Sequence, residues 1–219
     1  MTTHRWKALG QYLLPICKSI LFWKAPVRIQ SHAQLISFVQ SHARHVSQTA
    51  LFGYVKTRTG TRYTELFRDD LFVQSLNIAK WEIYLASLSD LTIFTCAHVA
   101  RQQPPGQTDP AALALQVYAS IVAGEPVPVE RAQGFDKDIE TFQTRLSIID
   151  WRDAAINEQT FAPSGQALFH WAPIADELKQ YDREIVLNSI RFKWKHIRDL
   201  FRTSLDVTTS ADFILQTEF

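Results

Sequence analysis

The sequence predicts an all-α fold: an irregular, single-domain helical bundle of about seven helices around a central apolar helix. Three observations lead to this prediction. Apolar residues recur at helical spacing through most of the 219-residue chain. The chain has only seven glycines, which disfavours a turn-rich β fold. Between residues 71 and 100 the apolar side chains go nearly all round the helix, which is typical of a helix surrounded by other protein.

Local signals at helix ends divide the chain into elements. Ser31 is a good N-cap with Gln34 three residues later, and Asp69 or Asp70 can cap the central helix. Asp109 precedes a proline at a first helical position. The expected helices, the first of them kinked by a proline, cover residues 4–23, 31–56, 64–68, 71–100, 110–123, 135–157, 164–171 and 173–205.

The composition is that of a folded, near-neutral protein. Hydrophobic residues make up 46% and charged residues 21%, which excludes disorder as the main state. The net charge of +1 argues against nucleic acid as a partner. We expect one helical domain over residues 1–219, with the loop at 125–134 as the boundary between two subassemblies.

A polar stripe runs along the central apolar helix. Its members follow one another at spacings of three or four: Gln74, Asn77, Trp81, Tyr84 and Ser87, with Lys80 and Asp90 close by. Polar groups in so apolar a helix need hydrogen-bond partners or water. Three interpretations stay open: an internal hydrogen-bond network, the wall of a ligand pocket, or a face that contacts a partner. Under the second, Lys80, Asn77 and Tyr84 are the candidate ligand-binding residues.

A basic, hydroxyl-rich loop after the second helix is a candidate anion site. Arg58 and Arg62 alternate there with threonines, and guanidinium groups with hydroxyls suit phosphate or carboxylate. The alternative is an ordinary solvated loop between two helices.

Two helices carry tryptophans among cations. The first holds Trp6 and Trp23 beside lysines and an arginine. The last holds Arg191, Lys193, Trp194 and Lys195, in a run that also includes Phe192. Such helices can lie on an anionic membrane or on an acidic protein, so these residues are the candidate partner or membrane surface. The alternative is that both helices pack inside the bundle while their cations reach water.

No motif predicts catalysis, a metal or a cofactor. His42 and His45 have a spacing that can share a metal, but no acidic residue stands where a third ligand is expected. Asp69 and Asp70 lack the further carboxylates of a magnesium–diphosphate site. Cys17 and Cys96 lie far apart in apolar surroundings, so we expect buried thiols without a disulfide, in the reducing cytoplasm.

Two functional hypotheses follow. The first is a non-catalytic binding protein, such as an adaptor, assembly factor or accessory subunit, which is cytoplasmic and either free or peripheral on the inner face of a membrane. The second is a small-molecule-binding protein or enzyme with an anion-holding pocket beside the central helix. The absence of a catalytic motif favours the first.

Overall fold

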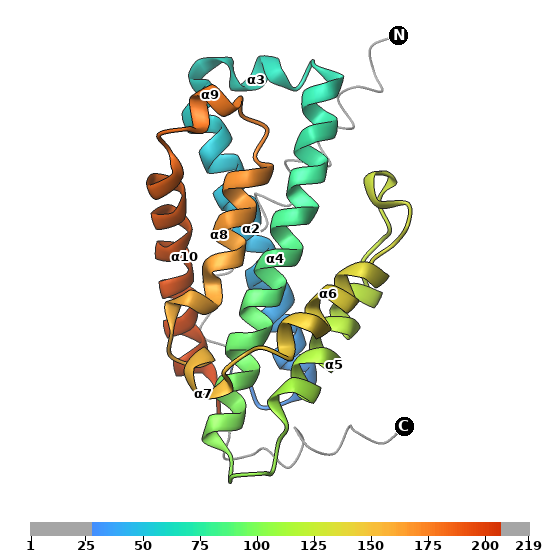
Figure 1. Ribbon diagram of the computed structural model, residues 1–219, viewed down its shortest axis with the longest axis vertical. Helices are drawn as coiled ribbons and strands as arrows, with labels where there is room; N and C mark the ends of the chain where they lie inside the picture. The colour runs from blue at the N-terminus through green and yellow to red at the C-terminus, as the bar shows by residue number, and fades with distance from the viewer. Residues whose placement is uncertain (1–27, 207–219) are drawn as a thin grey trace.

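The computed structural model describes residues 28–206 of the chain (Figure 1). All regular structure in this part is helical, apart from one isolated bridge between Ile29 and Leu205, so the predicted all-α fold is confirmed. The longer helices are α2 (His32–Thr59), α4 (Asp70–Gln102), α5 (Pro110–Ala123), α6 (Asp136–Leu146), α8 (Ala162–Trp171) and α10 (Arg183–Ser204). The shorter ones are α3 (Tyr63–Leu66), α7 (Trp151–Ala154) and α9 (Asp176–Lys179).

Helix α4 is the predicted central helix. It runs most of the length of the molecule, with α8 and α10 to one side of it and α5 and α6 to the other in the view of Figure 1. It packs most extensively against α2, α8 and α5. Its length and composition would suffice to cross a membrane, but 83% of its most apolar window is buried inside the bundle. The apolar surface of α4 is therefore covered by other helices of the chain.

The helix starts predicted from capping residues are confirmed. The Ser31 hydroxyl accepts a hydrogen bond from the Gln34 amide at the start of α2. Asp69 accepts from the amides of Leu71 and Phe72 at the start of α4, and Asp109 caps α5 in the same way. Helix α2 extends slightly further than expected, to Thr59.

Two predicted long helices are interrupted. The expected helix at 135–157 ends at Leu146, because the carboxylate of Asp150 caps a new short helix, α7, by accepting from the Arg152 amide at 2.9 Å. The expected helix at 173–205 is split at residues 180–182 into α9 and α10. At the first break the Asp150 side chain bonds to the backbone, and at the second the Asp182 side chain bonds to Arg58. The spacing of the apolar residues does not predict such side-chain bonds.

The two ends of the described chain are joined. The Ile29 amide donates to the Ser204 carbonyl at 2.8 Å, and the Asp206 amide donates to the Ile29 carbonyl at 3.1 Å. This pairing holds the start of α2 beside the end of α10. The expected helix at 4–23, with Trp6 and Trp23, and the residue Cys17 lie outside the described residues.

Helices α8 and α10 approach closely at Gly165. A Cβ atom added there would lie 2.8 Å from Cδ2 of Leu187 and 3.3 Å from Cγ2 of Ile190. Such distances leave no room for a branched side chain. Gly53, within α2, has no atom within 4 Å of the same added Cβ.

We predict that Gly165→Val lowers the free energy of unfolding by about 1–3 kcal/mol, because it overpacks this contact. The matched change Gly53→Ala should raise it by about 0.5–1 kcal/mol through helix propensity alone. Urea unfolding followed by circular dichroism measures both. An unchanged midpoint for Gly165→Val would contradict the close approach.

Candidate functional site

Two members of the polar stripe bind carboxylates from the segment that follows α5. Asn77 donates from Nδ2 to Oε1 of Glu130 at 2.9 Å, and the Tyr84 hydroxyl donates to Oε1 of Glu125 at 2.7 Å. Glu130 lies in the short 3-10 helix η2 (Val129–Arg131), and Glu125 comes directly after Gly124, where α5 ends. The stripe therefore fastens α4 to this segment, which includes the loop expected to separate two subassemblies.

The Glu125 carboxylate is the centre of this contact. Its Oε1 atom accepts from Tyr84, from Nε2 of Gln40 at 3.0 Å and from Nη2 of Arg44 at 2.6 Å. The Glu125 side chain is only 4% exposed, so these donors replace the water that the carboxylate loses on burial. The Arg44 guanidinium also lies 5.6 Å from the centre of the Tyr84 ring. One carboxylate thus holds α2, α4 and the end of α5 together.

Lys80 lies beside this contact and is partly buried. Burial is the main cause that lowers the pKa of Lys80, with Arg44 adding to the decrease, while Glu130 and Glu125 raise it. Burial likewise raises the pKa of Tyr84, and the hydrogen bond to Glu125 adds to the increase. The hydroxyl therefore stays protonated and donates. The structure brings the three candidate ligand-binding residues together, but it surrounds them with acidic groups of the chain itself.

The two candidate anion-binding arginines do not lie in the expected loop: Arg58 is in the last turn of α2 and Arg62 is in the short 3-10 helix η1 (Gly60–Arg62). Both have other partners. Arg58 forms an ion pair with Asp182, which also accepts a hydrogen bond of 2.8 Å from the Tyr54 hydroxyl. The hydrogen bond from Arg58 is the main cause that lowers the pKa of Asp182. Arg62 is exposed and lies 3.7 Å from Glu65. Arg58 therefore holds the segment before α10 against α2, and within residues 28–206 neither arginine is paired with a member of the polar stripe.

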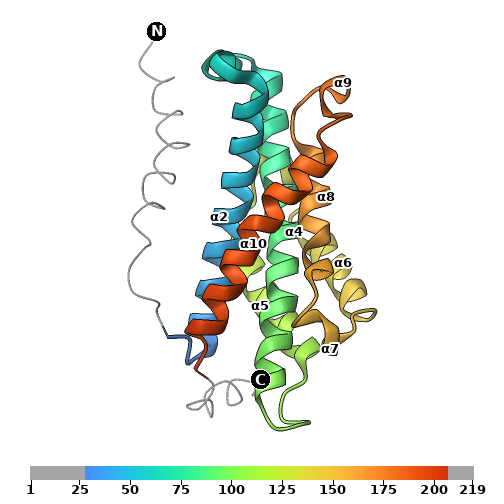
Figure 2. The same cartoon turned by 90° about the vertical axis from the view of Figure 1, so that its left-hand side faces the viewer.

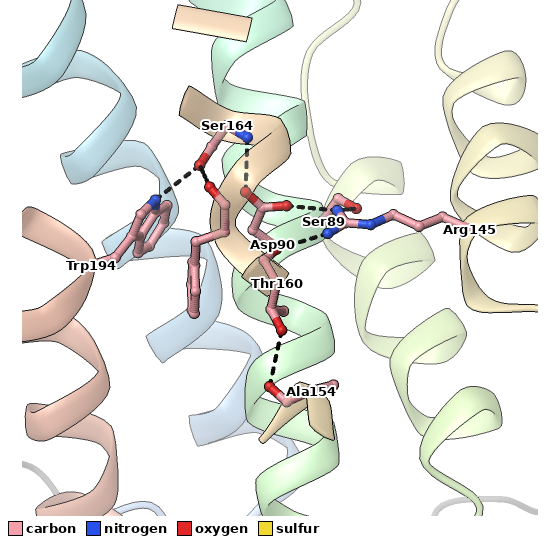
Figure 3. A network of polar contacts seen from close by, with 8 residues as sticks. Ser89, Asp90, Arg145, Ala154, Thr160, Ser164 and Trp194 are labelled. Carbon is pink, nitrogen blue, oxygen red and sulfur yellow. Dashed lines mark hydrogen bonds and ion pairs between the residues drawn. The ribbon is translucent and has the colours of Figure 1, made fainter. Parts of the chain in front are cut away.

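A second polar centre lies deeper, in the middle of α4 (Figure 3). The Asp90 carboxylate is fully buried; Oδ1 accepts from Nη1 of Arg145 at 2.6 Å, and Oδ2 accepts from the Ser164 amide at 2.9 Å. Arg145 also donates to the Ser89 hydroxyl at 2.6 Å and to the Thr160 carbonyl at 2.8 Å. Burial raises the pKa of Asp90 to about 6, although Arg145 and Ser164 act to lower it.

The Asp90 network continues to α10 through Trp194. The Ser164 hydroxyl accepts from Nε1 of Trp194 at 2.9 Å and donates to the Phe161 carbonyl at 3.1 Å (Figure 3). The Trp194 ring is 1% exposed and lies 4.8 Å from the Phe161 ring. The structure thus places Trp194 in the core rather than on the partner or membrane surface where the sequence pattern put it, because its indole N–H finds a buried acceptor. The helix expected to begin at residue 164 begins two residues earlier, so Ser164 lies within α8.

The outer face of α10 exposes apolar side chains. Phe192 is 79% exposed, Ile185 is 69% exposed, and Tyr181, just before the N-cap of the helix, is 82% exposed. With Asn188 they are spaced by four, three and four residues, and we call these four residues the outer seam of α10. The buried row lies on the opposite side of the helix and consists of Val186, Ile190, Trp194, Ile197 and Phe201.

Cations flank the outer seam. Arg191 and Lys195 are exposed, whereas Lys193 is partly buried and its pKa is lowered by that burial. Phe192 and Trp194, which the sequence analysis named in one run, lie on opposite sides of α10: Phe192 is exposed and Trp194 is buried. A second apolar period at Tyr181, Ile185 and Phe192, offset from the core period, is the signal that could have found the seam.

The two best-formed cavities of the described part are small. One, of about 210 Å³, is lined by residues of α8 and α10 that include Gly165 and Leu187. The other, of about 240 Å³, lies near His170 and Lys179. Both are smaller than the pockets of roughly 300–1,000 Å³ that hold drug-sized ligands. Neither is lined by a member of the polar stripe.

His42 and the described cysteine, Cys96, are packed groups. Within residues 28–206 no three His, Cys, Asp or Glu side chains gather as a metal site requires. His42 Nδ1 lies 2.9 Å from the Phe38 carbonyl, and the His42 ring stacks on the Phe38 ring at 4.1 Å. Cys96 is a free, buried thiol, and burial raises its pKa to about 12.

Comparisons of the chain with protein-family models, with curated proteins and with solved structures find no match.

We predict that Arg145→Met lowers the free energy of unfolding by about 3 kcal/mol at pH 7.5, as estimated for a buried carboxylate that loses its partner. The cost should fall at pH 5.5. The pKa of Asp90 in the folded protein is about 6, above its ordinary value of 3.8, so the group binds a proton more readily when folded. Its protonation stabilises the fold, and this stabilisation is lost as the pH rises through 6. Below that pH the Asp90 carboxyl group is neutral, so the removal of Arg145 lowers the free energy of unfolding less.

Urea unfolding at the two pH values measures this change. The control is the same Arg145→Met change made in the Asp90→Asn variant. Compared with Asp90→Asn alone, its cost should be similar at both pH values, because residue 90 then has no carboxylate to protonate. An equal cost of the single Arg145→Met variant at both pH values would exclude the Asp90 carboxylate as the cause.

Proposed function

We propose that this protein is a non-catalytic helical binding protein, such as an adaptor, an assembly factor or an accessory subunit, and that it contacts its partner through the outer seam of α10. The observation that carries the proposal is the exposure of Phe192, Ile185 and Tyr181 in one row. A single exposed apolar residue is ordinary on a protein surface, but Ile185 and Phe192 share one face of α10, and Tyr181, in the turn before the helix, extends the row. The opposite side of α10 already supplies the contacts that the fold needs.

The chemistry of the seam suits a protein partner. Tyrosine and arginine are enriched among the residues that contribute most to binding at protein interfaces, and here Tyr181 and Arg191 lie at or beside the seam. A helix face with apolar anchors seven residues apart, here Ile185 and Phe192, fits a partner helix or groove. We propose that the contact forms in the cytoplasm, as expected from the reducing compartment that the cysteines favour.

The alternative of a ligand pocket beside α4 has less support. Asn77 and Tyr84 already bind Glu130 and Glu125, and the acids around Lys80 would oppose an anionic ligand. We therefore assign no cofactor and no catalytic residue.

A second candidate is peripheral binding to the anionic inner face of a membrane. It is favoured by Arg191 and Lys195 beside the exposed Phe192, and by the basic helix expected at residues 4–23. Binding to vesicles that contain phosphatidylserine, absent with phosphatidylcholine alone and weakened by Phe192→Asp, is the result that would favour this candidate.

We predict that a photo-reactive benzoylphenylalanine at position 192 captures a discrete protein in cells. The control is the same residue at Ile148, which is 81% exposed and follows α6, far from α10 in the sequence. Gel mobility and mass spectrometry identify the adduct. Adding Ile185→Asp should reduce the yield at position 192 several-fold, because it places a charge in the contact. Equal, diffuse labelling at 148 and 192 would refute the proposed surface.

A further inference from the structure

We infer that the outer seam of α10 binds a second copy of this chain, with the two α10 helices antiparallel. The inference rests on the proposed function of the seam and names its partner. Four features carry it: the spacing of the seam residues, the charges beside them, the position of α10 and the low net charge of the chain.

The seam has the spacing of a two-helix interface. Within α10, Ile185, Asn188 and Phe192 are spaced by three and four residues, which is the period of the a and d positions in a coiled coil; Tyr181, in the turn just before the helix, lies a further four residues back. When two such helices run antiparallel, each a residue lies against a d residue of the other helix. Ile185 then faces Asn188 of the second copy, and Phe192 faces its Tyr181. A two-fold axis repeats both contacts.

The charges beside the seam complement one another in this register. Glu184 and Arg191 precede the two a residues, so they lie on the same edge of the seam. Counting along the antiparallel helices places Glu184 opposite Arg191 of the second copy, and the two-fold axis forms the pair twice. Opposite charges at these flanking positions select partner and orientation in coiled coils.

Other arrangements of the same two helices are less favourable. A shift by one heptad in either direction places Arg191 against Arg191 or Glu184 against Glu184, which is repulsive. A parallel pair places Arg191 beside His196 and forms no opposite-charge pair at these positions. The antiparallel pair in the register given above therefore both covers the apolar row and pairs opposite charges.

Within one chain these two groups do not pair with each other. They are seven residues apart on α10, about 10.5 Å along the helix axis. Glu184 lies 3.8 Å from the exposed Arg183, and Arg191 donates to Asn188 Oδ1 at 3.2 Å. Such surface contacts contribute little, so both groups can take a stronger partner. The bond from Arg191 also provides one partner for the Asn188 amide, the polar group of the seam.

The position of α10 allows the contact. It crosses the outside of the bundle, in front of α2 and α4 in Figure 2, and its seam lies opposite its buried row. The net charge of the chain is +1, so two copies repel each other little. The contact is small for a stable dimer, so we expect a reversible dimer in the micromolar range.

Charge reversal tests the register. Sedimentation equilibrium of the purified full chain, from about 1 to about 200 µM, should show a monomer–dimer equilibrium. Glu184→Arg and Arg191→Glu should each raise the dissociation constant about tenfold or more, because each creates two like-charge contacts. The double variant restores opposite charges in exchanged positions and should return to within about threefold of the natural chain.

Two further variants control the experiment. Phe192→Asp should abolish dimerisation, and Ile148→Asp, at an equally exposed apolar residue outside the seam, should leave it unchanged. Circular dichroism checks that each variant folds. A natural chain that stays monomeric throughout the range overturns the inference, as does a dimer that the single reversals do not weaken or the double variant does not recover. If the natural chain is monomeric, the inference fails, but the cross-linking experiment at position 192 still tests the proposed function.

Discussion

The burial of the Asp90 carboxylate in the middle of α4 is the constraint on which the packing of this bundle depends. A carboxylate in so apolar a helix is costly unless donors reach it from outside the helix. Arg145 of α6 and the backbone amide of Ser164 in α8 are those donors. Their bonds fix where α6 and α8 lie along α4, and the bond from Trp194 to Ser164 extends the same constraint to α10. Apolar burial provides most of the driving force, but it is not directional.

The Glu125 contact plays the same part elsewhere on α4. It joins α2 to α4 through Arg44 and Tyr84 and holds the segment that follows α5. Two buried acids therefore set the positions of the helices around α4. Glu125 also accounts for Tyr84, which could have lined a ligand pocket but is found with a partner from the chain itself, as is Asn77; the buried hydroxyl of Ser87 has no hydrogen-bond partner among the described residues.

The features predicted from the sequence were the local ones. The caps at Ser31, Asp69 and Asp109 depend on residues within three positions, and the apolar run of α4 is itself a local pattern. The partner of Asp90 could not be predicted, because Arg145 lies 55 positions away and the sequence holds many arginines. For the same reason only part of the site could be predicted. The polar stripe on an apolar helix indicated that Asn77 and Tyr84 need hydrogen-bond partners, but it did not identify those partners.

Helix α10 has one apolar row more than it needs to pack on the bundle, and the outer seam is this second row. One apolar row is enough to dock a helix on a core, and the row that includes Ile190, Trp194 and Phe201 does so. A second row, on the opposite side, adds nothing to the fold and leaves Phe192 and Ile185 in water. Covering that row with another helix removes the exposed apolar area, and the order of Glu184 and Arg191 along its edge supports an antiparallel helix of the same sequence. The buried acids Asp90 and Glu125 are bound within the bundle, whereas an apolar row of α10 is exposed, so we propose the outer seam of α10 as the surface that a partner covers.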